Sequence, residues 1–265
     1  MTIRIRKTFK NLELENHALL QENQNLHDHL KKTIQIRDDL FGLASHELKT
    51  PITSLRSQLE LLKRNSQPEV GLIPGSKHLS STLEASLGQV DRLTKLIGNM
   101  LDVTRIGAGK LQLTITSVDL VKLVQKVITS FSVELELAKC SIETHLPDVL
   151  IGEWDQGCIE QVIVNLISNA IKYAPSTLLS ISAFQTELKT TLKIRDNGPG
   201  IPKNKQNIIF NKFECVSSSE TCRSLGLGLY ICSQIIEKHA GTIHVQSEVG
   251  KGTEFIIELP NHSGK

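Results

Sequence analysis

The sequence predicts a multidomain chain of α and α+β type. An N-terminal coiled coil and a two-helix hairpin form a dimeric four-helix bundle, and an α/β sandwich follows. Three observations predict this fold class: apolar residues recur every seven positions through the first 40 residues, helical spacing resumes after a break rich in Pro and Gly at residues 65–78, and the second half alternates helical patterns with β-branched runs. The length of 265 residues allows about two domains.

The first element is a helix with a heptad repeat, from residue 9 to about residue 64. Its d positions hold Leu12, Leu19, Leu26, Thr33 and Leu40. Asn16 and Asn23 occupy a positions, where asparagine lowers stability but favours a two-stranded coiled coil in one register. The pattern therefore predicts a parallel homodimer, and a single long solvated helix is the alternative.

Beyond residue 40 the apolar spacing changes to three consecutive steps of four residues, a stutter that locally unwinds a supercoil. His46 lies about 200° around the helix from both Ala44 and Leu48. It is therefore expected to face away from the dimer axis, towards water or a partner. Pro51 removes a backbone donor and is expected to bend the helix just after the histidine.

Helical spacing returns at residues 83–101, so each chain supplies two antiparallel helices and a dimer supplies a four-helix bundle. A linker at residues 107–109 separates this part from the second half. There we expect helices at residues 119–137, 155–173 and 226–239, and strands at residues 140–145, 178–184, 191–195, 242–247 and 253–259. This order predicts helices packed on one face of a mixed sheet.

Composition excludes several classes of protein. With 39% hydrophobic and 22% charged residues the chain is not globally disordered, and a net charge of +2 does not predict a nucleic-acid or membrane surface. The five cysteines form no C-x-x-C pair, which favours a reducing compartment. Since no apolar run approaches the length of a membrane span, we expect a cytoplasmic chain, whether or not it was cut from a longer one.

The first candidate site is the run S-H-E-L-K-T-P at residues 45–51. Neutral imidazole is a competent nucleophile, and the adjacent carboxylate of Glu47 can orient the His46 ring and accept its proton. Thr50 lies one turn further along the same face. A helix surface of chance composition is the alternative reading.

The second candidate site is the segment at residues 161–173, within the helix predicted at residues 155–173. Asn165, Asn169 and Lys172 fall on one stripe at positions i, i+4 and i+7. Asparagine is a mediocre helix former, so two on one stripe suggest a function. Amide oxygens can complete the shell of Mg²⁺, and the lysine can pair with phosphates that the metal bridges. The alternative is an ordinary solvated helix face.

Two glycine-containing loops form the remaining candidate sites. Residues 196–201 read D-N-G-P-G-I directly after a predicted strand, where the glycines let a flat ring approach the backbone and Asp196 can accept a hydrogen bond from an exocyclic amine. Residues 224–231 place a glycine pair at the start of a helix, whose backbone N–H groups attract anions. A tight turn and a chance G-x-G are the respective alternatives.

In this order and spacing, the motifs make the chain resemble the sensor histidine kinases of two-component signalling, over about residues 35–260. Residues 45–51 look like the H box, 165–173 like the N box, 196–200 like the G1 box, 210–213 like the F box and 226–229 like the G2 box. The resemblance implies a coiled-coil signalling helix at 1–38, a dimerisation and histidine-phosphotransfer domain at 39–108, a catalytic ATP-binding domain of the GHKL type at 109–260 and a tail at 261–265.

The resemblance also implies a reaction: ATP-dependent autophosphorylation of His46, followed by phosphoryl transfer to an aspartate of a response-regulator receiver domain. Glu47 would deprotonate His46, and Thr50 would support a phosphatase activity. Asn169 would bind Mg²⁺ and Asp196 the adenine amine. The other implied nucleotide-binding residues are Asn165, Lys172 and Tyr173 on the N-box helix, and Gly198, Gly200, Gly226, Leu227 and Gly228 in the two loops. An upstream sensor would supply the stimulus.

Two departures from the family pattern keep an alternative function open. Ser224 stands where the G2 box usually begins with glycine, and Cys215 stands where an arginine often follows the F box, although Arg223 could replace that arginine. The alternative is a nucleotide-binding pseudokinase or a dimeric signalling scaffold without phosphotransfer. An ATPase of the chaperone or topoisomerase kind is disfavoured because such proteins have no H box. The stimulus, the cognate receiver and the choice between cis and trans phosphorylation are not predicted.

Overall fold

The computed structural model describes residues 48–60, 62, 76–214 and 225–261, with residues 20, 21, 23, 24, 27 and 31 of the N-terminal helix. The chain divides into two compact units, Met1–Leu96 and Ile97–Lys265, which are described separately. Most of the predicted coiled coil, the pair His46 and Glu47, and the segment 215–224 lie outside the described residues. No helix in the described ranges has an apolar stretch long enough to cross a bilayer.

Two helical segments make up most of the described part of the first unit. Residues 48–60 are helical, and α2 runs over Ser76–Gly107, so that its last turns belong to the second unit. The Ser86 hydroxyl of α2 donates a hydrogen bond of 3.1 Å to Gln58 Oε1, which places the two helices in contact. Ser86 also donates to the Thr82 carbonyl one turn earlier in α2, and its side chain is buried.

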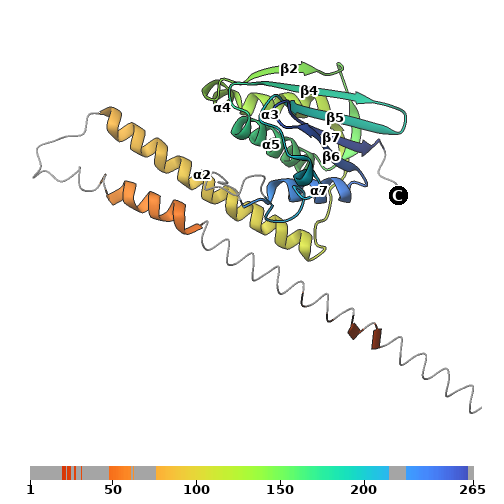
Figure 1. The fold of residues 1–265 in the computed structure, drawn as a ribbon, viewed down its shortest axis with the longest axis horizontal. Coiled ribbons are helices and arrows are strands. Elements are labelled where there is room, and N and C mark those ends of the chain that lie inside the picture. The colour runs from red at the N-terminus through yellow and green to blue at the C-terminus, as the bar shows by residue number, and fades with distance from the viewer. Residues whose placement is uncertain are drawn as a thin grey trace, which may run out of the picture. The chain divides into compact units, whose positions relative to one another are not determined.

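A five-stranded mixed sheet forms one layer of the second unit (Figure 1). Its order is β2-β4-β5-β7-β6, in which β2 pairs with β4 in parallel and all other pairs are antiparallel. The strands are β2 (Ser141–His145), β4 (Leu178–Gln185), β5 (Lys189–Asp196), β6 (Thr242–Glu248) and β7 (Gly252–Pro260). The mixed sheet confirms the predicted fold class.

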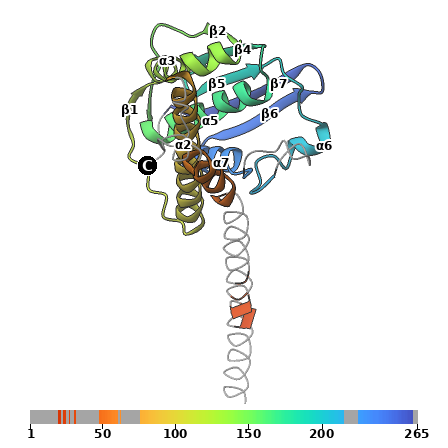
Figure 2. The same ribbon diagram turned by 90° about the vertical axis from the view of Figure 1, so that its left-hand side faces the viewer.

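Helices cover one face of this sheet, as Figures 1 and 2 show for α3 (Leu120–Ser130), α5 (Gln156–Tyr173) and α7 (Gly228–Lys238). The side of α5 that carries Ile159, Ile163 and Ile167, spaced four residues apart, is fully buried. Alternate residues of the central strands complete the core, because successive side chains of a strand point to opposite faces. Burial of these apolar faces is what holds α5 in a fixed position along the sheet.

Two details differ from the sequence-based expectation. The predicted helix at residues 119–137 is broken at Phe131 into α3 and α4 (Ser132–Leu137). Thr129 and Ser130 bond their hydroxyls to carbonyls of the preceding turn, and such residues favour helix ends. Strands β1 (Thr116–Asp119) and β3 (Ile151–Trp154) form a separate two-stranded sheet that was not predicted, because four residues are too few for a clear alternating pattern.

The short helix α6 (Lys203–Gln206) lies beside the edge strand β6 (Figure 2). It follows the loop at residues 197–202, which leaves the end of β5. That loop is therefore enclosed between the end of β5 and the turn that joins β6 to β7.

Candidate functional site

The sequence assigned roles to three H-box residues, His46, Glu47 and Thr50. Of these three, only Thr50 lies within the described residues. Its side chain is exposed on the helix at residues 48–60, whereas the neighbouring Pro51 is buried. The helix continues through the proline to residue 60.

The N-box residues lie on α5, which begins at an Asp155 cap whose carboxylate accepts a hydrogen bond of 2.9 Å from the Cys158 N–H group. Asn169 is half-buried, and Lys172 and Tyr173 are exposed at the end of the helix. The Lys172 ammonium donates to the Tyr173 hydroxyl at 2.7 Å and lies 4.5 Å from the centre of the tyrosine ring. This end of α5 therefore presents a positive charge beside an aromatic ring.

Asn165 differs from these neighbours, since it is only 7% exposed. It does not belong to a solvated helix face, which was the alternative reading of the motif. Apart from the weakly polar Cys232 thiol beside it, its Nδ2 group has no hydrogen-bond partner among the described residues. A buried amide donor without a strong acceptor is costly, so this donor is suited to an acceptor that a ligand supplies.

The first turn of α7 lies next to Asn165. A Cβ atom placed on Gly228 would stand 3.7 Å from both Cγ and Oδ1 of Asn165. Among the described residues, no side chain caps α7 at Leu227, so the first N–H groups of the helix add their partial positive charge to the same place. Asn165 and the first turn of α7 therefore lie side by side, at a helix start whose N–H groups attract anions.

Gly226 precedes this turn with φ +64°, a conformation that glycine adopts at little cost. A Cβ atom there would come within 2.7 Å of the Glu214 carbonyl oxygen. The Phe213 N–H group donates to the Gly226 carbonyl at 3.1 Å. The end of the F box and the start of the G2 box therefore lie against one another.

Asp196 ends strand β5, opposite Thr253 of β7. Its Oδ1 atom accepts a hydrogen bond of 2.8 Å from the Gly198 N–H group, and the backbone of Thr253 donates to the same carboxyl group. Burial raises the pKa of Asp196 above its ordinary value, although both backbone donors and the charge of Arg195 oppose the rise. A partly buried carboxylate oriented by two backbone donors is suited to recognise one polar edge of a ligand.

Gly198 brings this loop to the end of α5. A Cβ atom on Gly198 would stand 2.5 Å from the Ala174 Cβ, closer than side chains approach one another. Ala174 caps α5 directly after Tyr173. The Asp196 loop therefore lies at the C-terminal end of α5, while the start of α7 lies near its middle.

The role of Thr253 was missed from the sequence. The only sign of it in the sequence is the G-K-G-T-E-F run at residues 250–255, in which glycines flank the threonine. Gly252 has φ +95°, and a Cβ atom on it would come within 2.0 Å of the Asp196 carbonyl oxygen. This close approach places the start of β7 against the backbone of Asp196.

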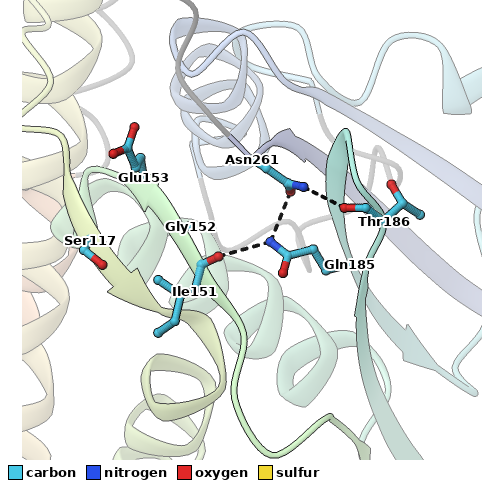
Figure 3. A pocket seen from close by; sticks show the side chains of 7 residues that line it. All are labelled: Ser117, Ile151, Gly152, Glu153, Gln185, Thr186 and Asn261. Atoms are coloured by element: carbon cyan, nitrogen blue, oxygen red, sulfur yellow. Dashed lines mark hydrogen bonds between the residues drawn. The ribbon is translucent and has the colours of Figure 1, made fainter.

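A separate hollow of about 410 Å³ lies at the other end of the sheet and contains no predicted site residue (Figure 3). Gln185 crosses it, donating from Nε2 to the Ile151 carbonyl at 3.1 Å and to Asn261 Oδ1 at 3.2 Å. Asn261, which the sequence placed in the tail, is buried and donates to the Thr186 carbonyl. Since these polar groups bind one another, their hydrogen bonds hold Asn261 against the end of β4.

Comparisons with known proteins agree with these features. Residues 36–109 match the family model of the His Kinase A (phospho-acceptor) domain, and residues 154–263 match that of the histidine kinase-, DNA gyrase B- and HSP90-like ATPase. The chain is 32% identical over 239 residues to the adaptive-response sensory kinase SasA of Thermosynechococcus vestitus, covering 89% of this chain and 63% of that one. It is 31% identical over 229 residues to the sensor protein SrrB of Staphylococcus aureus, covering 85% and 38%.

Among solved structures, the Acinetobacter baumannii histidine kinase AdeS superposes with a TM-score of 0.64 at 29% identity, over 82% of this chain and 98% of that one. The chain thus spans less than two thirds of the length of SasA and SrrB.

Proposed function

Because this chain belongs to the sensor histidine kinases of two-component signalling, we propose that it binds ATP and phosphorylates itself on His46. The phosphoryl group then passes to an aspartate of a response-regulator receiver domain. The observation that carries the proposal is the position of two loops along α5. The Asp196 loop contacts Ala174 at the helix end, and the uncapped start of α7 faces Asn165 nearer the helix middle.

These two contacts indicate how a nucleotide lies along α5. Asn165 and Ala174 are nine residues apart, which is roughly 13 Å along a helix axis. An extended nucleoside triphosphate can span this separation, with its base at Asp196 and Gly198 and its phosphates at Asn165 and Gly228. Asp196 then accepts a hydrogen bond from the exocyclic amine of adenine, and the positive charge of Lys172 lies on the phosphate path.

The donor set fits Mg²⁺ as the companion of the triphosphate. The described residues contain no group of three His, Cys, Asp or Glu side chains that could enclose a metal ion. Mg²⁺ does not need one, because it keeps several waters and takes one or two protein oxygens with phosphate oxygens. The half-buried amide of Asn169, one turn from Asn165, is the oxygen ligand that we assign to it.

In the reaction, an imidazole nitrogen of His46 forms a bond to the γ-phosphorus while the bond from that phosphorus to the β–γ bridging oxygen breaks and ADP leaves. Glu47 accepts the imidazole proton. The transition state is loose and highly charged, so Asn165, Lys172 and the N–H groups of α7 act by holding the triphosphate in line. Mg²⁺, when bound, supplies further neutralisation of the phosphate charge. In the opposing phosphatase activity, Thr50 would hold the water molecule that takes the phosphoryl group and releases it as inorganic phosphate.

The partner that the kinase needs first is a second copy of itself. Apolar residues of α2 at heptad-like spacing are 43–63% exposed within one chain: Leu83, Leu87, Val90, Ile97 and Leu101. Such a stripe is suited to pack against the same stripe of a second chain in a four-helix bundle. We assign this dimerisation and phosphotransfer part to residues 39–108 and the catalytic part to residues 109–260, between the coiled coil at 1–38 and the tail at 261–265.

The test is labelling with γ-labelled ATP and Mg²⁺. We expect acid-labile, base-stable label that disappears in His46→Gln and remains in the control His145→Gln, which replaces an exposed histidine on β2. Label that persists in His46→Gln would exclude this acceptor. ATP binding without any label would instead favour the pseudokinase or scaffold. Mixing His46→Gln with Asn169→Ala protomers distinguishes cis from trans transfer, because only trans transfer labels the mixture.

A further inference from the structure

We propose that Ser247 and Gln206 are positioning residues for the base end of the nucleotide site. They hold the loop at residues 197–201, so that the affinity for ATP depends on two side chains that do not touch the nucleotide. The inference rests on the proposed function, because it takes Asp196 and Gly198 as the base-binding residues. It adds a role for the β6–β7 hairpin and for α6, to which the motifs assign none.

Ser247 lies near the end of β6 and uses its hydroxyl group three times. The hydroxyl accepts a hydrogen bond of 2.7 Å from the Ile201 N–H group and donates one of 2.8 Å to the Gly252 carbonyl. It also lies 3.1 Å from the Thr253 hydroxyl. One half-buried oxygen therefore joins the exit of the loop to the first residues of β7, which contact Asp196.

Gln206, the last residue of α6, holds the same position from the other side. Its Nε2 group donates to the Ile201 carbonyl at 2.8 Å and to the Ser247 carbonyl at 2.7 Å. Both acceptors are carbonyl oxygens, so the amide nitrogen must point towards them. The N–H and C=O groups of Ile201 are thus both bound by side chains from outside the loop.

Backbone contacts press the rest of the loop onto the β6–β7 turn. The Gly250 N–H group donates to the Pro199 carbonyl at 2.8 Å. Gly200 has φ +72°, and a Cβ atom on it would come within 2.2 Å of the Glu248 carbonyl oxygen. The loop has no regular secondary structure of its own, so its shape depends on these contacts with the hairpin.

The phosphate end of the site has different supports. Asn165 and Gly228 lie on α5 and α7, which pack against one another, whereas Ser247 and Gln206 lie on β6 and α6. Loss of the Ser247 hydroxyl should therefore disturb the base end alone. That separation gives the inference an outcome that general destabilisation would not produce.

The experiment compares Ser247→Ala, Ser247→Thr and wild type in the full chain. We expect Ser247→Ala to weaken MgATP binding about tenfold by calorimetry. It should raise KM for ATP in autophosphorylation to a similar degree and change kcat by less than about twofold, since the phosphate end is intact. Ser247→Thr keeps a hydroxyl group and should bind ATP within about twofold of wild type. Hydrogen exchange of the segment 197–208 should accelerate in Ser247→Ala only.

Substitutions of Gln206 provide an independent test of the same inference. Gln206→Glu points a carboxylate at two carbonyl oxygens and should weaken ATP binding more than Gln206→Ala does. The control Ser130→Ala removes a hydroxyl that bonds only within α3 and should change nothing. Unchanged ATP affinity in Ser247→Ala, an equal loss in Ser247→Thr, or a fall in kcat instead of a rise in KM would overturn the inference. A wild-type chain that binds no MgATP contradicts the proposed function first, and the inference falls with it.

Discussion

At the scale of single residues, Asn165 is the side chain that best separates folding from function. A buried amide whose donor lacks a strong acceptor does not help the free protein to fold, since the unmet donor costs about 1–3 kcal/mol of unfolding free energy. Its presence at the uncapped start of α7 is explained if a phosphate oxygen completes its hydrogen bonding. An apolar residue at this position would then favour the stability of the free protein, whereas asparagine favours the binding of a phosphate.

The first prediction follows from that conflict. Asn165→Leu removes the unmet donor at nearly constant size, so we expect the free energy of unfolding in denaturant to stay the same or rise by up to about 1 kcal/mol, while MgATP affinity falls at least about tenfold. Asn169→Leu, at a half-buried position, should lose ATP binding without the gain in stability. A loss of more than about 2 kcal/mol in Asn165→Leu would show that the amide supports the fold instead.

His239 supplies the second prediction, on pH. The buried ring accepts a hydrogen bond at Nε2 from the Asp155 N–H group and lies 2.8 Å through Nδ1 from the Ile235 carbonyl, so it is neutral. Burial lowers the pKa of His239 below its ordinary value of 6.5, although the Ile235 carbonyl and the Asp155 carboxylate oppose this. Protonation therefore favours the unfolded chain, and the stabilisation is complete above pH 6.5 and is lost as pH falls through 6.5 towards the folded-state pKa.

We expect the free energy of unfolding to fall between pH 7 and about pH 5, with His239→Gln showing a shallower fall, because glutamine does not titrate. The control Ser130→Ala replaces a hydroxyl that does not titrate and bonds only within α3, and it should keep the wild-type slope. Denaturant unfolding at several pH values measures it. An identical slope in His239→Gln would mean that other groups cause the acid sensitivity.

At the scale of secondary-structure elements, the site depends on α5 and on the start of β7. The buried isoleucines fix α5 against the sheet, and this fixes the positions of Asn165 and Ala174 along one axis. Across the site, the Thr253–Asp196 pair sets where β7 begins. The end of α5 and the β6–β7 hairpin thus contact opposite sides of the loop that follows β5.

The third prediction tests that close approach. Gly252→Ala forces a side chain into a φ of +95° and within 2.0 Å of the Asp196 carbonyl, so we expect a loss of about 2–4 kcal/mol of unfolding free energy. It should weaken ATP binding as well, because Thr253 moves away from Asp196. The matched control Gly157→Ala adds a Cβ at ordinary contact distance, 3.5 Å from Asp155 Oδ1, in the first turn of α5. It should be neutral or stabilising by up to about 1 kcal/mol, and equal effects of the two substitutions would contradict this account.

At the scale of the whole molecule, the exposed stripe on α2 is the feature that one chain cannot explain. Burying a large apolar side chain contributes about 1.5–3 kcal/mol. Five such residues on one helix face therefore represent a substantial gain for a partner with the same face.

The fourth prediction compares two equally exposed residues. Leu87 on α2 and Val133 on α4 are both 63% exposed. We expect Leu87→Glu to convert the dimer to monomer in sedimentation velocity and to lower autophosphorylation, while ATP binding stays unchanged. Val133→Glu should leave the dimer intact. A Leu87→Glu chain that remains dimeric would show that another surface, such as the N-terminal coiled coil, carries the association.

Much of the fold and family could be predicted from the sequence. Apolar periodicity marks α5 and α7 to within about two residues at each end, and the order of the N, G1, F and G2 motifs identifies the family. The short strands β1 and β3 were not predicted, because four residues give too little pattern. The break at Phe131 was not predicted either, because it depends on local hydroxyl bonds. Spacing placed Asn165 on one stripe with Asn169 and Lys172, but it could not show that Asn165 is buried while Lys172 is exposed.

The sequence by itself thus determined which residues carry chemistry and which segments are helices or strands, because both properties are local. Only the tertiary structure decided that Ser247 and Gln206 bind Ile201, that Thr253 donates to Asp196 and that Asn165 lies beside Gly228. These contacts join residues that are far apart in the chain. They are set by the packing of hairpin and helices around a common core, which no local pattern encodes.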